Sequence, residues 1–260
     1  METYNQVRKQ NIQFYRIPKN KERVGKIVQH LVSKGNSIPL PSGGRLTVQR
    51  FMLLGRSFGS TDGLIETSQL LGTTTADIAL GGVTQATLDR VDKVVKFGGR
   101  PLYAALHEAI YCDGSGVVSN WAADRVGVKH PASTGAEYAW LWRDAAKAQA
   151  DTMFFAGEMI YPFHFDTFAE LGPFKDVAER LAKCDDWPAL YDRGRLSVNT
   201  VPVCAVGYRN DMYVSAKFGK ETSEMIKGAK YYESPDLAHD AIRTNTNTVL
   251  QHLAQMSQGP

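Results

Sequence analysis

Two residues near the end of the chain have the types and the placement of an acid–base pair. Asp211 follows the apolar run VPVCAVG, and His239 follows the segment AKYYES. An aspartate in such a pair holds the histidine in one tautomer and stabilises the imidazolium that forms when the ring accepts a proton. Both residues come after predicted strands, in the order acid then histidine, which favours the general base of a hydrolase. The competing interpretation is that Asp211 caps a helix beginning near Ser215 and that His239 is an ordinary loop residue.

One serine lies in a G-x-S-x-G pattern, which is typical of the strained turn called a nucleophile elbow. Ser57 lies at the centre of GRSFG, behind the apolar run FMLL, in the only G-x-S-x-G of the chain. A nucleophile elbow needs earlier strands beside it, but the residues upstream have the patterns of helix and loop. The nearest candidate for an oxyanion loop is PSGG at residues 41–44, in an unsuitable context. These features count against Ser57 as a nucleophile, and this role stays as the alternative.

Two glutamates lie inside apolar, aromatic stretches. Glu108 belongs to LHEAIYC, and Glu158 belongs to FFAGEMIYPF. A buried carboxylate is costly unless a cation or hydrogen bonds meet it. One interpretation is that both glutamates face a pocket and bind a cationic group such as a substrate amine. The other is an internal salt bridge, for instance to Arg125 or Arg143.

The elements that must position these residues divide the chain into two regions. Apolar spacing predicts helix over residues 3–34, interrupted at Pro18, and a loop or turn over residues 36–47. Helical stripes continue to about residue 195, including a helix that starts at FKDVAERLAKC and is expected to bury Val177, Leu181 and Cys184. Residues 196–260 read as two β-α units, with Cys204 buried in the first strand. The predicted fold class is α/β, with a helical, cap-like region at 1–195 and part of a parallel-sheet core at 196–260.

Composition excludes several classes of function. The chain of 260 residues is 43% apolar and 22% charged with a net charge of +3, which is typical of an ordinary globular protein. The cations are scattered, so no nucleic-acid partner is expected. No run of apolar residues is long enough for a membrane span and no signal peptide is recognisable, so a cytoplasmic location without a membrane partner is expected. The histidines and cysteines lack metal-ligand spacing, and neither a metal nor a cofactor is expected.

Several longer stretches carry a family resemblance. LPSGGRLTVQRFMLLGRSFG, LHEAIYC, NWAADR, FFAGEMIYPF, DDWPALYD, VPVCAVGYRNDMYV and HDAIR resemble, in this order, the middle and C-terminal parts of fungal-type proline iminopeptidases. That resemblance implies a serine peptidase of the α/β-hydrolase fold with a helical cap, which removes an N-terminal proline from a peptide with a free amine. Asp211 and His239 match the family's acid and base. Glu108 and Glu158 lie in segments similar to the cap elements that supply amine-binding acids.

The resemblance also implies that part of the enzyme is missing. In such proteins the oxyanion loop, the early strands and the serine elbow precede the cap, and this chain begins where the cap begins. GRSFG falls within the cap by that register. We therefore expect an incomplete α/β-hydrolase, truncated at its N-terminus and inactive alone, made of the cap and the last two β-α units.

Two further hypotheses stay open. The chain could be a non-catalytic remnant that binds a peptide or partner through its cap and an unpaired sheet edge, with homo-oligomerisation as one consequence. It could also be an esterase or lactonase that uses Ser57. Triad residues alone do not separate amide from ester hydrolysis.

Overall fold

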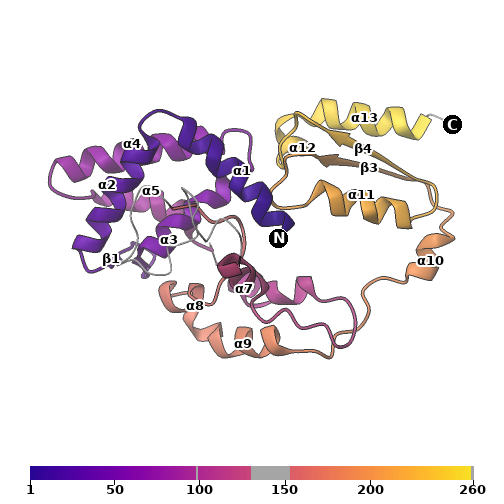
Figure 1. Ribbon diagram of the computed structural model, residues 1–260, viewed down its shortest axis with the longest axis horizontal. Coiled ribbons are helices and arrows are strands. Elements are labelled where there is room, and N and C mark those ends of the chain that lie inside the picture. Colours follow the sequence, from indigo (N-terminus) through magenta and orange to yellow (C-terminus); the bar gives the residue numbers. More distant parts are fainter. Residues whose placement is uncertain (98, 130–152, 259–260) are drawn as a thin grey trace.

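A computed structural model describes residues 1–97, 99–129 and 153–258 (Figure 1). The elements follow one another as α1 (Glu2–Arg16), α2 (Asn20–Ser33), β1 (Ile38–Pro39), β2 (Arg45–Leu46), α3 (Val48–Met52), the 3₁₀ turn η1 (Leu53–Ser57), α4 (Gly63–Ala79), α5 (Gln85–Val95), α6 (Pro101–Ala105), η2 (His107–Tyr111), α7 (Ala122–Lys129), α8 (His164–Thr167), η5 (Gly172–Phe174), α9 (Lys175–Lys183), α10 (Arg193–Ser197), β3 (Val203–Tyr208), α11 (Ala216–Met225), β4 (Ala229–Ser234), α12 (Ala241–Thr244) and α13 (Thr246–Gln258). Helices dominate the first two thirds of the chain.

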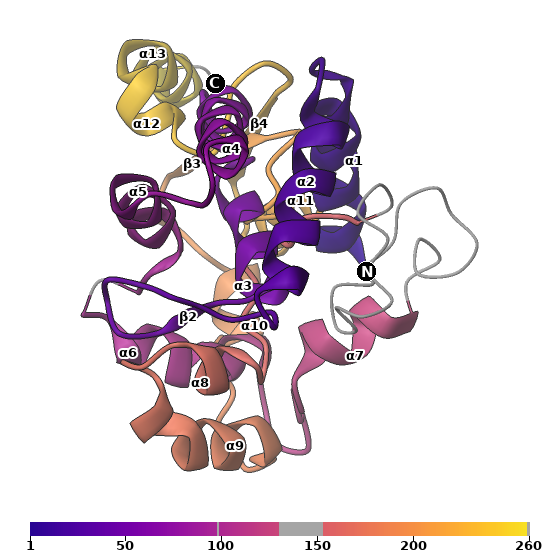
Figure 2. The same cartoon turned by 90° about the vertical axis from the view of Figure 1, so that its left-hand side faces the viewer.

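The predicted helix over residues 3–34 is confirmed as α1 and α2, which are separated at Pro18. Their apolar stripes are buried, with Val7 and Phe14 on α1 and Val24 and Ile27 on α2. Figure 2 shows α1 and α2 side by side, with α4 next to them. The predicted loop at 36–47 contains a short antiparallel hairpin, β1 with β2, that the turn residues alone did not indicate.

The aromatic run MFFAGEMIYPF passes through the centre of the helical region. Phe155 packs against Phe14 at 5.2 Å between ring centroids, and Phe14 stacks on Phe58 at 4.7 Å. Asn11, fully buried on α1, binds the backbone of Phe155 twice: its amide donates to the carbonyl at 2.9 Å and its oxygen accepts from the N–H at 2.7 Å. These contacts satisfy backbone groups that would otherwise be buried unpaired. They fix the segment that carries Glu158.

A buried ion pair ties three elements of the helical region together. Arg50 on α3 donates to Asp92 on α5 at 2.9 Å, and both side chains are almost fully buried. The same guanidinium donates to the Thr167 carbonyl at 3.0 Å and lies 3.8 Å from the Phe168 ring centroid. Because each charge is buried with partners, removal of either one leaves the other uncompensated.

The C-terminal unit is a parallel pair of strands with helices on either side (Figure 1). β3 pairs with β4 in the register Val203 to Ala229, and the crossover between them is α11; α13 packs on β3. The two predicted strands are confirmed, and the chain combines a helical region with a β-α-β unit, which is compatible with an α/β fold.

Burial in two places differs from the sequence expectation. Cys204 is half-buried, as is every residue of β3, because among the described residues β4 is the only strand that pairs with β3. On α9 the buried residues are Ala178 and Ala182, whereas Val177 is exposed. The small side chains let α9 approach the loop before α7, where Asn120 donates its N–H to the Ala182 carbonyl at 2.7 Å.

No helix in the described part of the chain is both long and apolar enough to cross a membrane.

Candidate active site

Asp211 and His239 meet beyond the carboxyl ends of β3 and β4. Asp211 Oδ2 lies 2.8 Å from His239 Nδ1, and the aspartate side chain is buried while the imidazole is partly exposed. The other carboxylate oxygen, Oδ1, accepts the backbone N–H groups of Tyr213 at 2.7 Å and Val214 at 2.9 Å. An ionised Asp211 requires the proton on Nδ1, which leaves Nε2 as an acceptor. The structure thus brings together the two residues that the sequence paired.

Tyr213 holds the imidazole from the side. Its ring centroid lies 4.5 Å from that of His239, and its hydroxyl donates to the carbonyl of Arg56 in η1. Tyr213 therefore contacts three different groups. Its ring packs on His239, its backbone N–H donates to Asp211, and its hydroxyl donates to the Arg56 carbonyl. Tyr213 links the acid–base pair to the helical region, a role that no sequence motif indicated.

The GRSFG segment (residues 55–59) packs against the loop that carries His239. The backbone N–H of His239 donates to the Gly59 carbonyl at 3.3 Å. A Cβ on Gly59 would lie 2.3 Å from Tyr213 Cε2 and 2.6 Å from Met212 Cγ, so any larger residue would displace these side chains. Just beyond, the Thr61 hydroxyl donates to Asp240 Oδ1 at 2.8 Å. The motif's glycine thus permits a close approach of two segments.

Ser57 itself points elsewhere. It ends η1, and its hydroxyl donates to the Leu54 carbonyl at 2.9 Å and lies 3.0 Å from the Thr67 hydroxyl. The residues before it form α3 and η1 rather than a strand. Ser57 is absent from the described lining of the cavity beside His239.

His239 opens onto a cavity of about 320 Å³ between the two regions. Its described lining is largely aromatic and apolar and consists of Thr3, Tyr103, His107, Ile110, Tyr111, Glu158, Met159, Met212, Tyr213, Val214 and His239. Pockets of this size with a few polar groups on apolar walls are suited to small organic ligands. A potential base, His239, and a carboxylate, Glu158, face the same space.

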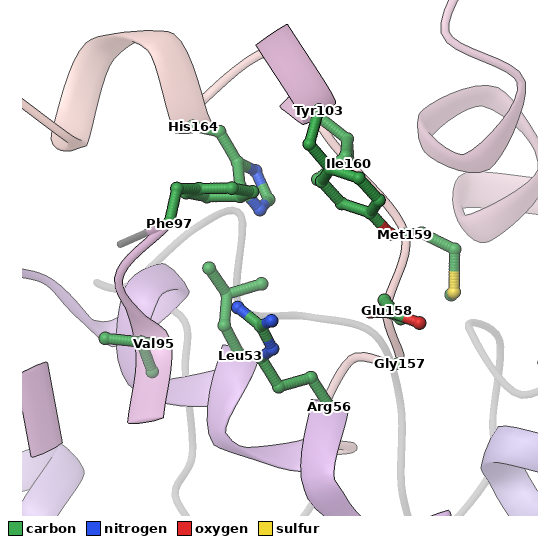
Figure 3. Close-up of a pocket in the computed structure, with 10 residues that line it drawn as sticks. All are labelled: Leu53, Arg56, Val95, Phe97, Tyr103, Gly157, Glu158, Met159, Ile160 and His164. Atoms are coloured by element: carbon green, nitrogen blue, oxygen red, sulfur yellow. The ribbon is translucent and has the colours of Figure 1, made fainter. Parts of the chain in front are cut away.

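Glu158 stands where this cavity joins a narrower cleft. Figure 3 shows the cleft, whose lining includes Glu158, Tyr103 and the Arg56 side chain. Burial and then the negative charge of Glu158 raise the pKa of Tyr103 to about 12. Burial, followed by the same charge, also raises the pKa of Tyr213. Glu158 is thus a half-buried carboxylate edged by neutral tyrosines.

Glu108 is not among the described residues that line the cavity beside His239 and lies behind the wall of that cavity. Its side chain is buried in η2, Oε2 accepts the Ala122 N–H at 3.4 Å, and Oε1 has no hydrogen-bond partner among the described residues. The alternative of a salt bridge to Arg125 is not observed, because that guanidinium donates to the carbonyls of Ser119 and Asn120 at 2.8 Å. Arg143 lies outside the described residues.

The lining histidine His107 belongs to the same turn. Its Nε2 lies 3.0 Å from the Tyr111 hydroxyl, and burial lowers its pKa to about 4. A neutral imidazole is therefore expected in this wall near neutral pH. Within residues 1–97, 99–129 and 153–258, no group of three or more His, Cys, Asp or Glu side chains is arranged to hold a metal ion.

Comparison with known proteins identifies relatives of one kind. The chain is 33% identical to a proline iminopeptidase of Aeromonas sobria over 258 residues, which cover 98% of this chain and 56% of that protein. It is 29% identical to the proline iminopeptidase aneH of Aspergillus aculeatus over 253 residues, or 96% of this chain and 52% of that protein. No protein-family model matches the chain.

The chain thus spans about half the length of the curated relatives it matches. Both alignments take in nearly all of its residues, the helical region and the β-α-β unit alike. Over the part of their length that it spans, the chain is similar to proline iminopeptidases.

Proposed function

We propose that this chain forms the amine-binding and acid–base part of a peptidase that releases N-terminal proline from peptides. The observation that carries the proposal is that His239 and Glu158 line one cavity. A base beside a carboxylate suits a substrate whose scissile bond lies close to a free amine, as at a peptide N-terminus. The relatives' names point to the same substrate class.

The geometry supports defined roles for these residues. Nε2 of His239 accepts the proton of an attacking serine hydroxyl and returns it to the leaving amine as the acyl bond breaks. Asp211 holds the ring and stabilises the imidazolium. Glu158 pairs with the substrate ammonium, and the walls formed by Tyr103 and Met159 suit an apolar proline ring. Glu108 acts from behind this wall, where its charge raises the pKa of Tyr111 after the larger effect of burial.

The nucleophile is the missing component of this arrangement. No serine is among the described residues that line the cavity, and Ser57 is hydrogen-bonded away from it. We therefore propose that the chain is an incomplete α/β-hydrolase, in which residues 1–195 form the cap and residues 196–260 form part of the core. Without a nucleophile the chain alone has no route to turnover, because the remaining groups only bind and orient substrate.

The binding half of the proposal is tested with prolinamide, which has the amine and the ring but lacks the second residue of a peptide. Calorimetry should show saturable binding to the chain, weakened about tenfold or more in Glu158→Gln, since a hydrogen bond to a charged group contributes roughly 1.5–3 kcal/mol. The exposed Glu221→Gln is the matched control and should bind like the parent. Equal affinity in all three proteins would sink the assignment of Glu158.

The catalytic half is tested with a proline aryl-amide. We expect no turnover above background by the chain, and no change in Ser57→Ala. Measurable turnover that disappears in Ser57→Ala would transfer the nucleophile role to Ser57. Cleavage of an N-acetylated prolyl ester, which lacks the cationic amine, would then favour the esterase hypothesis.

One observation favours a second candidate, a binding role through the β-α-β unit. Among the described residues β3 and β4 pair only with each other, and Val198 and Val201 before β3 are about two thirds exposed, at 65% and 66%. Exposed apolar surface of this kind promotes association. Sedimentation velocity should detect a dimer at micromolar concentration, and a strictly monomeric chain would contradict this candidate.

A further inference from the structure

A second cavity with a strongly basic lining adjoins the candidate active site. It has a volume of about 230 Å³, and its described lining consists of Arg56, Lys93, Lys96, Phe97, Arg100, Tyr103 and Glu158. Glu158 and Tyr103 line both cavities, so they form the wall between them. We call this space the basic cavity.

Its cations come from separate segments. Arg56 extends from η1, whereas Lys93 and Lys96 stand at the end of α5 and Arg100 follows before α6. Lysines at a helix C-terminus offset the helix dipole, which accounts for two of the four charges. It does not account for Arg56 and Arg100, which converge on the same space from elsewhere.

These four cations form no ion pair with a carboxylate in the described part of the chain. The nearby acids are already engaged. Asp92 pairs with Arg50 at 2.9 Å, and Glu170 accepts the backbone N–H groups of Phe97 at 2.8 Å and Gly99 at 3.3 Å. Glu158 is thus the one carboxylate on the described lining.

This charge arrangement has a consequence for Glu158. A substrate ammonium that approaches the carboxylate also approaches the guanidinium and ammonium groups behind it, and like charges repel. Arg56 is half-buried, so solvent screens its charge less than that of an exposed residue. An anion held in the basic cavity would offset this repulsion.

We propose that the basic cavity binds a phosphate-type dianion and that its occupation strengthens amine binding at Glu158. Four cations against one carboxylate favour a compact ligand with two negative charges, and guanidinium groups suit phosphate oxygens. The second half of the proposal rests on the proposed function. Linkage requires that an amine bound at Glu158 strengthens phosphate binding by the same factor.

Calorimetry of the whole chain with inorganic phosphate tests the site directly, with sodium chloride keeping the ionic strength constant. We expect saturable one-to-one binding that weakens at least tenfold in Lys96→Ala/Arg100→Ala, both exposed positions that leave the core intact. Lys9→Ala/Lys34→Ala removes the same charge from exposed positions on α1 and after α2 and should leave binding unchanged. Absence of saturable binding, or equal weakening in both double variants, would overturn the proposal.

Phenyl phosphate distinguishes two sources of the dianion. The volume of the basic cavity exceeds that of one phosphate, so a phosphate monoester should bind at least as tightly as inorganic phosphate. Binding of inorganic phosphate alone would restrict the ligand to the free ion. Glu158→Gln should tighten the binding of either ligand, because it removes a like charge from the wall.

The coupling is measured with prolinamide in the presence and absence of saturating phosphate. We expect several-fold tighter prolinamide binding with phosphate present, and loss of this effect in Lys96→Ala/Arg100→Ala. Phosphate binding without prolinamide binding would refute the proposed function and leave the anion site standing. Prolinamide binding without phosphate binding would refute the anion site and leave the proposed function standing. Binding of both ligands with no effect of one on the other would overturn the coupling.

Discussion

The helical region and the β-α-β unit differ in how their apolar residues are covered. In the helical region Val7, Phe14 and Leu71 are completely buried. In the β-α-β unit every residue of β3 is half-buried, and Leu250 on α13 is 52% exposed. Buried apolar area is the main source of stability. We therefore expect the helical region to hold most of the folding free energy and the β-α-β unit, with Asp211 and His239 after its strands, to hold less.

The comparison shows what keeps Asp211 and His239 in place. The two strands supply the loops, and Asp211 accepts backbone N–H groups of its own loop, but further contacts come from the helical region, at Gly59, Thr61 and the Arg56 carbonyl. The site is thus assembled across the boundary between a stable and a marginal part. Perturbations of each part should have distinct signatures.

The largest effect is expected from Asp92→Ala in the helical region. It leaves the Arg50 guanidinium buried without its carboxylate and removes the acceptor of the Ser42 N–H and hydroxyl, both at 2.8 Å. Loss of one member of a buried pair costs about 3–5 kcal/mol. Urea unfolding followed by circular dichroism measures this change. Lys26→Ala breaks the exposed pair with Glu22 and should change stability by a few tenths of a kcal/mol; equal losses would contradict the assignment.

A smaller effect, concentrated at the boundary, is expected from Gly59→Ala. The new Cβ displaces Tyr213, whose ring packs on His239, so overpacking should cost about 1–3 kcal/mol. Chemical shifts of the His239 ring protons should move. Gly72→Ala on α4 is the control: its nearest atom would be Arg23 Nη2 at 3.4 Å, and alanine favours helix by up to about 1 kcal/mol. Unchanged His239 shifts in Gly59→Ala would show that Tyr213 does not position the ring.

The sequence predicted the parts of this arrangement that depend on local pattern. Apolar spacing located α1, α2, β3 and β4, and the order of strands and polar residues placed Asp211 near His239. The spacing of glycine and serine identified GRSFG, but it did not reveal what the segment contacts. The hydrogen bond from the Tyr213 hydroxyl to the Arg56 carbonyl joins residues 157 positions apart. No periodicity encodes such a contact.

Burial was less predictable than element type. The apolar surroundings of Glu108 indicated correctly that the side chain is buried, yet they contained nothing about which side of the cavity wall it occupies. Val177 and Cys204 were expected to be buried from residue type, but exposure depends on which neighbours cover a face. That information is tertiary, and one sequence does not carry it.

Acid sensitivity should originate in the helical region. Burial lowers the pKa of His107 to about 4 and that of His164 to about 3, from an ordinary value of 6.5. The unfolded chain therefore binds more protons as pH falls below about 6.5, and the stability present above that pH is progressively lost down to pH 4 or 3. The slope is about 1.4 kcal/mol per pH unit for each histidine near the middle of the window.

Urea unfolding at pH 7, 6 and 5 measures this slope. His164→Gln should lower this slope by the contribution of about one proton, since one titrating group is removed. His30→Gln on α2 is the comparison, because that pKa is lowered by partial burial and by Lys34, and its removal should reduce the slope less. A slope unaffected by His164→Gln would mean that His164 titrates alike in both states.

The smallest effect is expected when a leucine is replaced by alanine in the β-α-β unit rather than in the helical region. Leu250→Ala on α13 should change the free energy of unfolding by no more than about 0.5 kcal/mol, since the side chain is half exposed already. Leu71→Ala on α4, a completely buried position, should cost about 2–5 kcal/mol. If Leu250→Ala costs as much and the cost grows with protein concentration, the exposed face of the β-α-β unit is covered by a second molecule in solution, and the contrast between the regions belongs to the isolated chain alone.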